Sequence, residues 1–386
     1  MGKSLRLMAI VISLSLAQAP VMASVKAGSP CTKHGAKQKS GGKSFTCIKQ
    51  GKKLVWNKGV ALKKPAAPVV APTQPLPTPS ASSTAIEPVV PAPEPSPSQK
   101  KVAFTPWATT FDTEDMTQLA LAKTSEYFGT VKSSNAYTLF IDPAITASDR
   151  ELVTKSLDYA NGAFSNLLQG RIKVFLGTTH QWSANAMRGA GTWAGDPGAP
   201  FPCSDGSRDA YCAGPDVVLL TFSDLYKPNS TYGWDVGRRS TPAHEMFHTV
   251  QFVLNGANLA PSNPTYIPRW LMEGSANYFG FYIVDKLALG TYQEGRKGQV
   301  NNNSNYTSVV PLVQYDNFNS DPYGIGQAAS EYLIASAGFE NFLNIWKFTK
   351  SEGSFTRGFA KAIGMEISEF YNKFEAARGS MKIGKE

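Results

Sequence analysis

The sequence predicts an α+β fold for a large domain at residues 101–386, preceded by a small disulfide-stapled β module at residues 24–64. Short apolar or alternating runs, which are typical of strands, occur before residue 222, and helical periodicity dominates after residue 239. Eleven prolines in residues 65–100 prevent any helix or sheet from running through that segment. We therefore expect two folded parts joined by a proline-rich linker.

The first 23 residues have the features of a secretory signal peptide. Lys3 and Arg6 provide the positive start, the apolar core from Leu7 to Ala17 is too short to span a bilayer with ease, and Val21-Met22-Ala23 is a small-residue cleavage site. No later stretch has 18 uninterrupted apolar residues. We expect a mature protein outside the cell, secreted or associated with the cell envelope, without a transmembrane segment after cleavage.

The net charge of +9 comes from the N-terminal end. The first 64 residues hold 13 of the 38 basic residues and no acidic residue, which leaves 25 basic against 29 acidic residues in the rest. Two interpretations of these lysines stay open: they bind an anionic cell-envelope polymer, or they solvate a very small domain. Nucleic acid is not expected as a partner, because no recognisable binding fold accompanies the charge.

Four cysteines predict one disulfide in each folded part. Cys31 and Cys47 bracket several glycines, near two expected short strands at 45–48 and 53–56 that turn at Gly51. Cys203 and Cys212 lie in a loop rich in Gly, Pro and Asp, from 189 to 214. Because short loops close more readily than long ones, we expect Cys31 to pair with Cys47 and Cys203 with Cys212. The first segment resembles small C…G…C…W modules of secreted proteins from Gram-positive bacteria.

Local pattern predicts the elements of the large domain. Strands are expected at 136–141, 171–176 and 215–221, and the last run suits a central strand. A helix should run from Ser148, its N-cap, to about Leu168, with Glu151 three residues after the cap. Further helices are expected at 239–255, 268–289, 323–337, 339–350 and 366–378.

Two histidines four residues apart, His244 and His248, fall within the expected helix at 239–255. That spacing places both rings on one helix face, where they can bind one metal ion. With one further ligand, such an ion keeps a position for water, and Glu245 beside it can accept the proton as hydroxide attacks a carbonyl. This is the H-E-x-x-H pattern of zinc hydrolases. An ordinary amphipathic helix with surface or core histidines is the alternative.

A candidate for the third ligand, Glu273, lies one turn inside the expected helix that begins with Pro268. A carboxylate among apolar neighbours needs a cation or a proton, because burying it unpaired is costly. Gly274 beside it allows close approach of another element.

The stretch Trp270-Leu271-Met272-Glu273-Gly274-Ser275-Ala276 resembles the W-L-x-E-G-x-A motif that follows H-E-x-x-H in the gluzincin metallopeptidases. The resemblance implies a zincin-like domain, with an N-terminal mixed sheet plus helices and a C-terminal helical subdomain. It implies His244, His248 and Glu273 as ligands of one catalytic Zn²⁺, and Glu245 as general base. The chain lacks the G-x-M-E-N stretch of aminopeptidases and a third histidine of metzincins, so an endopeptidase of the looser peptidase MA-like group matches best.

Tyr323-Gly324-Ile325-Gly326 looks like the Y-x-x-G helix of the same clan, whose tyrosine donates to the forming oxyanion. Packing at a helix start is the other interpretation of Tyr323, and Tyr315 is a competing candidate. Turn chemistry explains Asp196, Asp205, Asp209 and Asp216 better than a calcium site does, because no loop signature accompanies them. His180 is expected at the surface or a strand end rather than as a transition-state donor, and Asn301 to Ser308 as a surface loop.

These observations lead us to expect a secreted zinc-dependent endopeptidase that acts on protein or peptide. Two alternatives stay open: an inactive zincin-like protein attached to the cell envelope, and a zinc amidase or esterase that acts on envelope material.

Overall fold

The computed structural model describes residues 27–31, 37–40, 43–51, 53–58, 60–61, 102–192, 210–222, 235–256, 260–302, 310–315 and 321–385. The predicted signal peptide at 1–23 and linker at 65–100 lie outside these residues, as do Cys203, three of the four loop aspartates and most of the 301–308 run. The described residues fall into two compact units, one ending by residue 93 and one beginning at residue 94.

The smaller unit is a four-stranded antiparallel sheet. Strand β2 (Lys43–Gln50) pairs with β1 (Lys37–Ser40), β3 (Lys53–Trp56) and β4 (Val60–Ala61), and β2 turns into β3 at Gly51, where φ is 61°. Cys47 is fully buried and bonded to Cys31, so the predicted staple is confirmed. Closing a loop of 16 residues in this way is worth about 3 kcal/mol in a unit too small for a sizeable core.

The larger unit contains a four-stranded mixed sheet with the order β5-β6-β8-β7. β5 (Thr138–Ile141), β6 (Lys173–Gly177) and β8 (Val217–Thr221) run parallel, and β7 (Ala210–Ala213) pairs antiparallel with β8 at the edge. The run at 215–221 therefore forms an interior strand, as predicted. Cys212 on β7 is disulfide-bonded, and its expected partner Cys203 lies outside the described residues.

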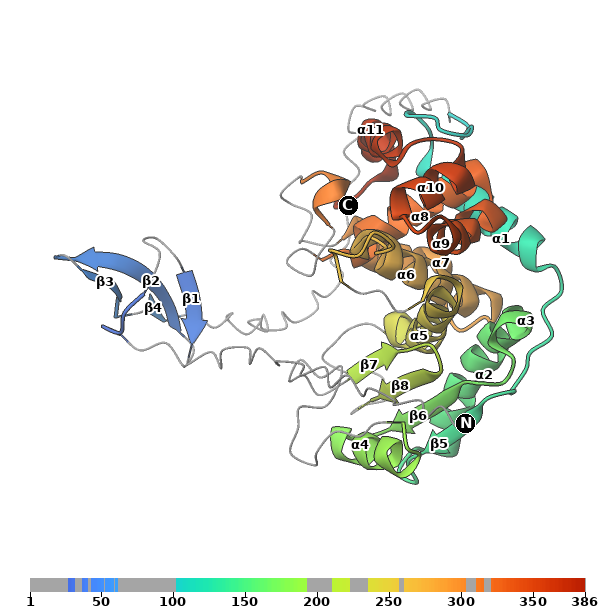
Figure 1. The fold of residues 1–386 in the computed structure, drawn as a ribbon, viewed down its shortest axis with the longest axis horizontal. Coiled ribbons are helices and arrows are strands. Elements are labelled where there is room, and N and C mark those ends of the chain that lie inside the picture. Colours follow the sequence, from blue (N-terminus) through green and yellow to red (C-terminus); the bar gives the residue numbers. More distant parts are fainter. Residues whose placement is uncertain are drawn as a thin grey trace, which may run out of the picture. The chain divides into compact units, whose positions relative to one another are not determined.

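Side chains alternate between the two faces of this sheet. Val174, Leu176, Val218 and Leu220 point into the main core of the unit, whereas Phe175 and Leu219 form a separate small cluster with Met187 of α4 (His180–Gly189). The sheet therefore separates α4 from the helices packed on its other face (Figure 1).

Helices make up the rest of the larger unit. They are α1 (Thr113–Phe128), α2 (Ala147–Ala163), α3 (Ser165–Leu168), α5 (Asp235–Asn255), α6 (Arg269–Lys286), α7 (Tyr292–Arg296), α8 (Tyr323–Ala337), α9 (Phe339–Glu352), α10 (Phe355–Ile363) and α11 (Ile367–Ala377). A π-helical turn at Lys297–Asn301 continues α7, and 3-10 turns lie at Leu312–Gln314 and Arg378–Met381. No helix in the described part of the chain is long and apolar enough to cross a membrane.

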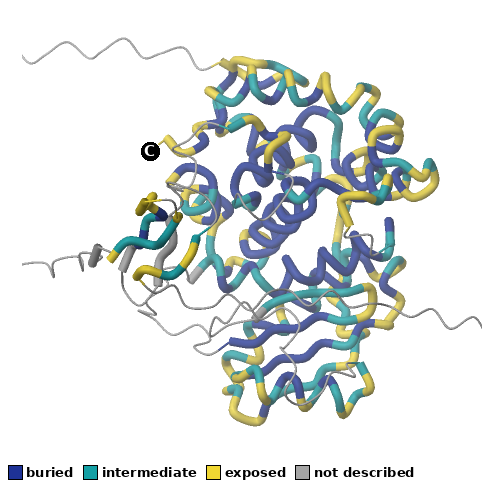
Figure 2. The backbone as a smooth tube through the Cα atoms, turned by 60° about the vertical axis from the view of Figure 1, so that its left-hand side comes forward, coloured by how far each residue is buried: buried dark blue, intermediate teal, exposed yellow. Residues whose placement is uncertain are grey.

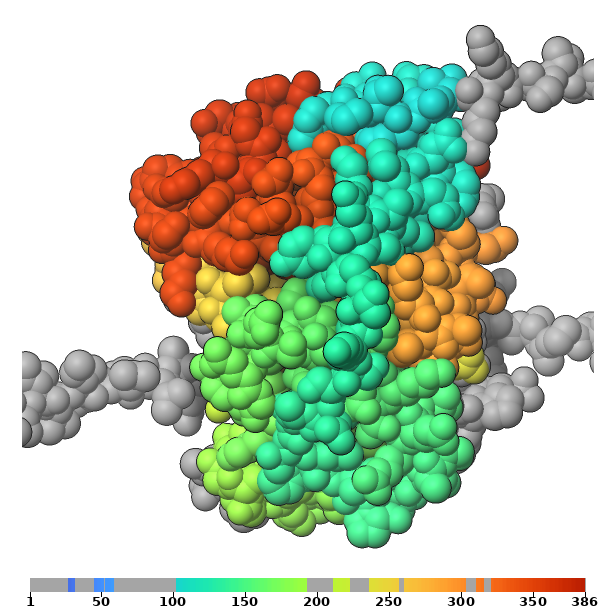
Figure 3. Space-filling view, turned by 90° about the vertical axis from the view of Figure 1, so that its right-hand side faces the viewer, coloured from blue at the N-terminus to red at the C-terminus, as the bar shows by residue number. Residues whose placement is uncertain are grey.

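Buried residues concentrate in the central helices and strands, and the outer helices carry the exposed positions (Figure 2). The exposed segment between α1 and β5 runs over the surface from the helical half towards the sheet (Figure 3). Among the central elements, α6 is buried along nearly its whole length, so its polar residues must find partners inside the protein.

Two glycines allow α6 and α8 to touch through their backbones. A Cβ atom on Gly274 would lie 2.0 Å from the carbonyl carbon of Gly326, and a Cβ on Gly326 would lie 2.0 Å from the Trp270 carbonyl oxygen. The close approach expected at Gly274 is thus present. On another side of α6, Gly280 leaves room for Ser240 and His244 of α5.

A buried ion pair joins α7 to α8. Arg296 Nε donates to Glu331 Oε2 at 2.8 Å, and Tyr292 donates to the other oxygen of Glu331 at 2.7 Å. Arg296 also donates to Asn301 and to the carbonyl of Met381, so it holds the chain after α11 against α7 and α8.

Several element predictions were wrong in detail. The N-cap of α2 is Thr146, whose hydroxyl accepts from Asp149 N at 3.1 Å, and not Ser148; the helix also ends at Ala163 and gives way to the short α3. Helices α1, α4, α7 and α10 were not predicted. Because α1, α2 and α4 are interleaved with the strands, the two kinds of element are mixed in the first half and not segregated along the chain.

Candidate metal centre

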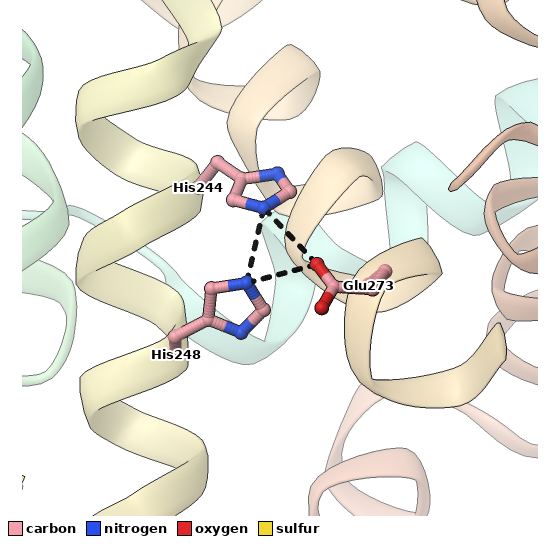
Figure 4. Close-up of side chains that lie close together, drawn as sticks. All are labelled: His244, His248 and Glu273. Carbon is pink, nitrogen blue, oxygen red and sulfur yellow. Dashed lines mark hydrogen bonds and ion pairs between the residues drawn. The ribbon is translucent and has the colours of Figure 1, made fainter. Parts of the chain in front are cut away.

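Helix α5 places His244 and His248 on the side that faces α6. Ala243, Met246, Phe247 and Val250 are buried in the core, and they anchor α5. The two rings are edge to face with centroids 4.7 Å apart, and Glu273 reaches them from α6 (Figure 4). Each of the three residues is more than nine-tenths buried.

The three expected ligand atoms converge on one point. The Nε2 atoms of His244 and His248 are 3.0 Å apart, and Glu273 Oε2 lies 3.6 Å from the first and 3.2 Å from the second. Tetrahedral ligands with metal bonds of about 2.0–2.1 Å would be separated by roughly 3.3 Å. The triangle therefore has the size that a small tetrahedral metal ion requires.

Both histidine rings form a hydrogen bond through Nδ1, on the side away from the cluster, which leaves Nε2 as an acceptor on the side that faces Glu273. His248 Nδ1 lies 2.8 Å from Gln251 Oε1, and His244 Nδ1 lies 2.9 Å from Asn277 Oδ1. Since both partners are acceptors, each Nδ1 carries the proton, and a neutral ring then presents a bare Nε2. Two lone pairs and a carboxylate oxygen face one another, an arrangement that needs a cation.

The charges in this cluster are strongly coupled. Burial lowers the pKa of His248, but the nearby Glu273 carboxylate outweighs this effect and raises the pKa to about 9. Burial alone would raise the pKa of Glu273, yet the charges and hydrogen bonds of His248 and His244 hold that pKa well below its usual range. A proton on His248 and a metal ion are alternative sources of the positive charge that Glu273 requires.

Arg269 orients the carboxylate of Glu273. Its Nη1 lies 3.2 Å from Glu273 Oε1, the oxygen that is turned away from the histidines. With Oε1 engaged in this way, Oε2 is the oxygen left to act as a single-atom ligand.

Glu245 stands beside the cluster. Its Oε1 is 4.0 Å from His244 Nε2, and its Oε2 is buried with no hydrogen-bond partner among the described residues. Burial raises the pKa of Glu245, and this outweighs the opposing effect of the two histidines. A carboxyl group with an unsatisfied oxygen and a raised pKa is suited to accept and return a proton.

Tyr323, at the first position of α8, packs near the cluster. Its ring centroid lies 6.1 Å from that of His244. Burial raises its pKa, and the charges of Glu273 and Glu245 raise it further, so the hydroxyl stays protonated and able to donate. Burial raises the pKa of the competing candidate Tyr315, and the charges that act on it are those of Arg378, Asp321 and Glu375 instead.

Three residues around the cluster were missed from the sequence: Gln251, Asn277 and Arg269. Helical spacing could have found them, because Gln251 follows His248 by three positions, and Arg269 and Asn277 flank Glu273 at four positions on either side. Residues at such spacings share a helix face with a ligand: Gln251 and Arg269 contact the ligand of their own helix, and Asn277 contacts His244 of the neighbouring helix.

The other predicted candidates lie elsewhere. His180 begins α4, so the sheet separates it from His244 and His248. Asp216 is exposed and offers its backbone carbonyl to Lys173, and the other three loop aspartates lie outside the described residues. Within the described ranges, His244, His248 and Glu273 form the one group of potential ligands that comes together.

No protein-family model matches this chain, and no curated protein matches it either. The interpretation of the centre therefore rests on its own residues.

Proposed function

We propose that this chain is a zinc-dependent endopeptidase of gluzincin type, exported from the cell, which hydrolyses peptide bonds of protein or peptide substrates. The observation that carries the proposal is the buried group His244, His248 and Glu273 with the carboxyl of Glu245 beside it. A His₂Glu donor set is typical of catalytic zinc sites that leave one position for water. When bound, zinc would act as a Lewis acid that activates water and polarises the substrate carbonyl.

The chain's own residues account for the proton transfers. Glu245 accepts the proton of the attacking water and delivers it to the leaving amine, because burial keeps its proton affinity above that of an ordinary glutamate. Tyr323 donates a hydrogen bond to the oxyanion as it forms, a contact that strengthens in the transition state.

Zinc content and proteolysis, measured on the same full-length samples, test this proposal. We expect about one zinc per chain and hydrolysis of an unfolded protein substrate. Glu245→Gln should keep the zinc and lower kcat by about 100-fold or more, because only the proton shuttle is removed. Glu273→Ala should lose the zinc, because His244 and His248 alone provide only two of the three protein ligands.

Glu340→Gln, at an exposed position on α9, is the matched control and should change neither quantity. Retention of one zinc at wild-type affinity by Glu273→Ala would overturn the ligand set. A zinc-loaded protein that leaves peptide bonds intact but cleaves envelope amides or esters would overturn the peptidase assignment.

A further inference from the structure

We propose that Gln251 is a positioning residue: it fixes the orientation of His248 and ties that ligand to the turn of α6 that carries Glu273. This inference rests on the metal site of the proposed function. It concerns a residue that touches neither metal nor substrate and acts through its hydrogen bonds.

Gln251 is 2 % exposed, and its side chain lies between α5 and α6 and forms hydrogen bonds in two directions. Its Oε1 accepts from His248 Nδ1 at 2.8 Å. Its Nε2 donates to the Met272 carbonyl at 2.9 Å and to Ser275 Oγ at 2.8 Å. Each bond is well within hydrogen-bonding distance, and the amide makes them all at once.

These partners determine which way the amide points. The Met272 carbonyl can only accept, so the atom that faces it must be the amide nitrogen and the atom that faces His248 must be the oxygen. The oxygen can only accept, so His248 Nδ1 must be the protonated nitrogen. Gln251 thereby selects the tautomer in which His248 Nε2 is free to bind a metal.

The anchor points join two ligands that come from different helices. Met272 directly precedes Glu273, and Ser275 follows it by two positions, with Ser275 Oγ also donating to the Met272 carbonyl at 3.1 Å. One amide thus connects the α5 ligand His248 to the α6 segment that holds Glu273. The separation of the two ligand atoms is set before any metal arrives, which reduces the cost of ordering them.

Asn277, the equivalent partner of His244, is less firmly held. Its Oδ1 faces His244 Nδ1, but its Nδ2 is buried and has no hydrogen-bond partner among the described residues. The orientation of Asn277 is therefore supported by packing alone on that side. This asymmetry makes Gln251 the stronger of the two anchors.

The test compares Gln251→Met with wild type by metal affinity and by NMR. Methionine keeps the length and volume of the side chain and removes all three hydrogen bonds. Loss of such an outer partner typically weakens metal binding by about 10–100-fold, and we expect a zinc Kd raised by that factor in competition with a chelator. In the zinc-loaded wild type, the His248 Nδ1 proton should give a slowly exchanging NMR signal that the variant lacks.

Gln327→Met is the matched control. Gln327 is also fully buried in a central helix, but its amide donates to Tyr292 and not to a ligand of the cluster. We expect this variant to lower the Tm of the metal-free protein while its zinc Kd stays within about threefold of wild type. Ser275→Ala removes one anchor of Gln251 and keeps the bond to His248, so it provides a milder test should Gln251→Met fail to fold. It should raise the zinc Kd by less than the Gln251 substitution does.

The outcomes separate this inference from the proposed function. A zinc Kd and a His248 Nδ1 signal unchanged in both Gln251→Met and Ser275→Ala would overturn the role of Gln251 alone. A wild-type protein that binds zinc with the expected Gln251 effects but hydrolyses no peptide would overturn the peptidase assignment alone. A wild-type protein that binds no divalent metal would overturn both.

Discussion

The proposed role of Tyr323 depends on the position of its hydroxyl group, which must be able to donate a hydrogen bond to the oxyanion. Its ring packs near His244, and burial together with the carboxylates of Glu273 and Glu245 raises its pKa, so its hydroxyl stays protonated beside the cluster. Removing one such donor usually costs about 100-fold in kcat, or roughly 3 kcal/mol, with little effect on ground-state binding. We expect Tyr323→Phe to show this loss with KM and zinc content nearly unchanged.

Tyr315→Phe serves as the comparison, because the charges that act on Tyr315 are those of Arg378, Asp321 and Glu375 and not those of the cluster. It should affect kcat far less than Tyr323→Phe. A kcat for Tyr323→Phe within about threefold of wild type would remove Tyr323 from the proposed mechanism.

The sequence predicts the three residues that come together as candidate ligands, whereas the contacts of their neighbours across the two helices are not predicted from it. His244 and His248 are recognisable because a regular helix fixes their relative placement, and Glu273 because a buried carboxylate requires a cation. The spacing of Gln251 from His248 indicates their contact, but its bonds to Met272 and Ser275 lie across the interface between α5 and α6. Contacts between helices depend on their distance and crossing, which local pattern does not determine.

At the scale of elements, the contact between α6 and α8 depends on two glycines. Gly326→Ala would place a methyl group 2.0 Å from the Trp270 carbonyl oxygen, so the helices must separate. Overpacking of this kind costs about 1–3 kcal/mol and occasionally more. We expect Gly326→Ala to lower the free energy of unfolding, measured in urea, by about 3 kcal/mol or more, because the backbone of α6 cannot rotate away as a side chain can.

Gly189→Ala is the control, since a Cβ at the last residue of α4 would meet nothing within 4 Å. It should leave the free energy of unfolding unchanged or raise it by up to about 1 kcal/mol. Equal stability of the two variants would contradict the backbone contact.

Among the helices that were missed, α4 shows how a local pattern can fail to indicate a helix. Helix α4 places Ser183, Ala184 and Met187 against the sheet, a face with too little apolar character to be distinguished from a loop. At α2 the sequence does not distinguish Thr146 from Ser148 as the N-cap, because the hydroxyl of either residue can accept a hydrogen bond from a backbone N–H of the first turn. Boundaries of this kind are determined by how the preceding strand ends.

At the scale of the whole molecule, we expect the buried Arg296–Glu331 pair to contribute strongly to the free energy of unfolding of the larger unit. Arg296→Met leaves a fully buried carboxylate without its cation, which typically costs about 3–5 kcal/mol. We expect a loss of that size in denaturant unfolding. Arg296→Met combined with Glu331→Leu should recover part of it, because no charge is then left unpaired.

The exposed pair Lys361–Glu352 provides the contrast, although its separation of 2.6 Å is shorter than the 2.8 Å of the buried pair. Solvent screens such a pair, so Lys361→Met should have little effect on stability. An equal loss of stability from Arg296→Met and Lys361→Met would show that burial does not explain the contribution of the Arg296–Glu331 pair.

The same network has a consequence for a chain that emerges gradually from a ribosome or a translocation pore. Arg296 donates one hydrogen bond to the carbonyl of Met381, which follows it by 85 residues. Until those residues have emerged, the guanidinium lacks an acceptor that it needs for burial, and α7 and α8 cannot close around it. Tyr323 begins α8, so its placement beside His244 also waits for that closure. Assembly of the candidate metal centre would therefore follow the synthesis of its own residues rather than accompany it.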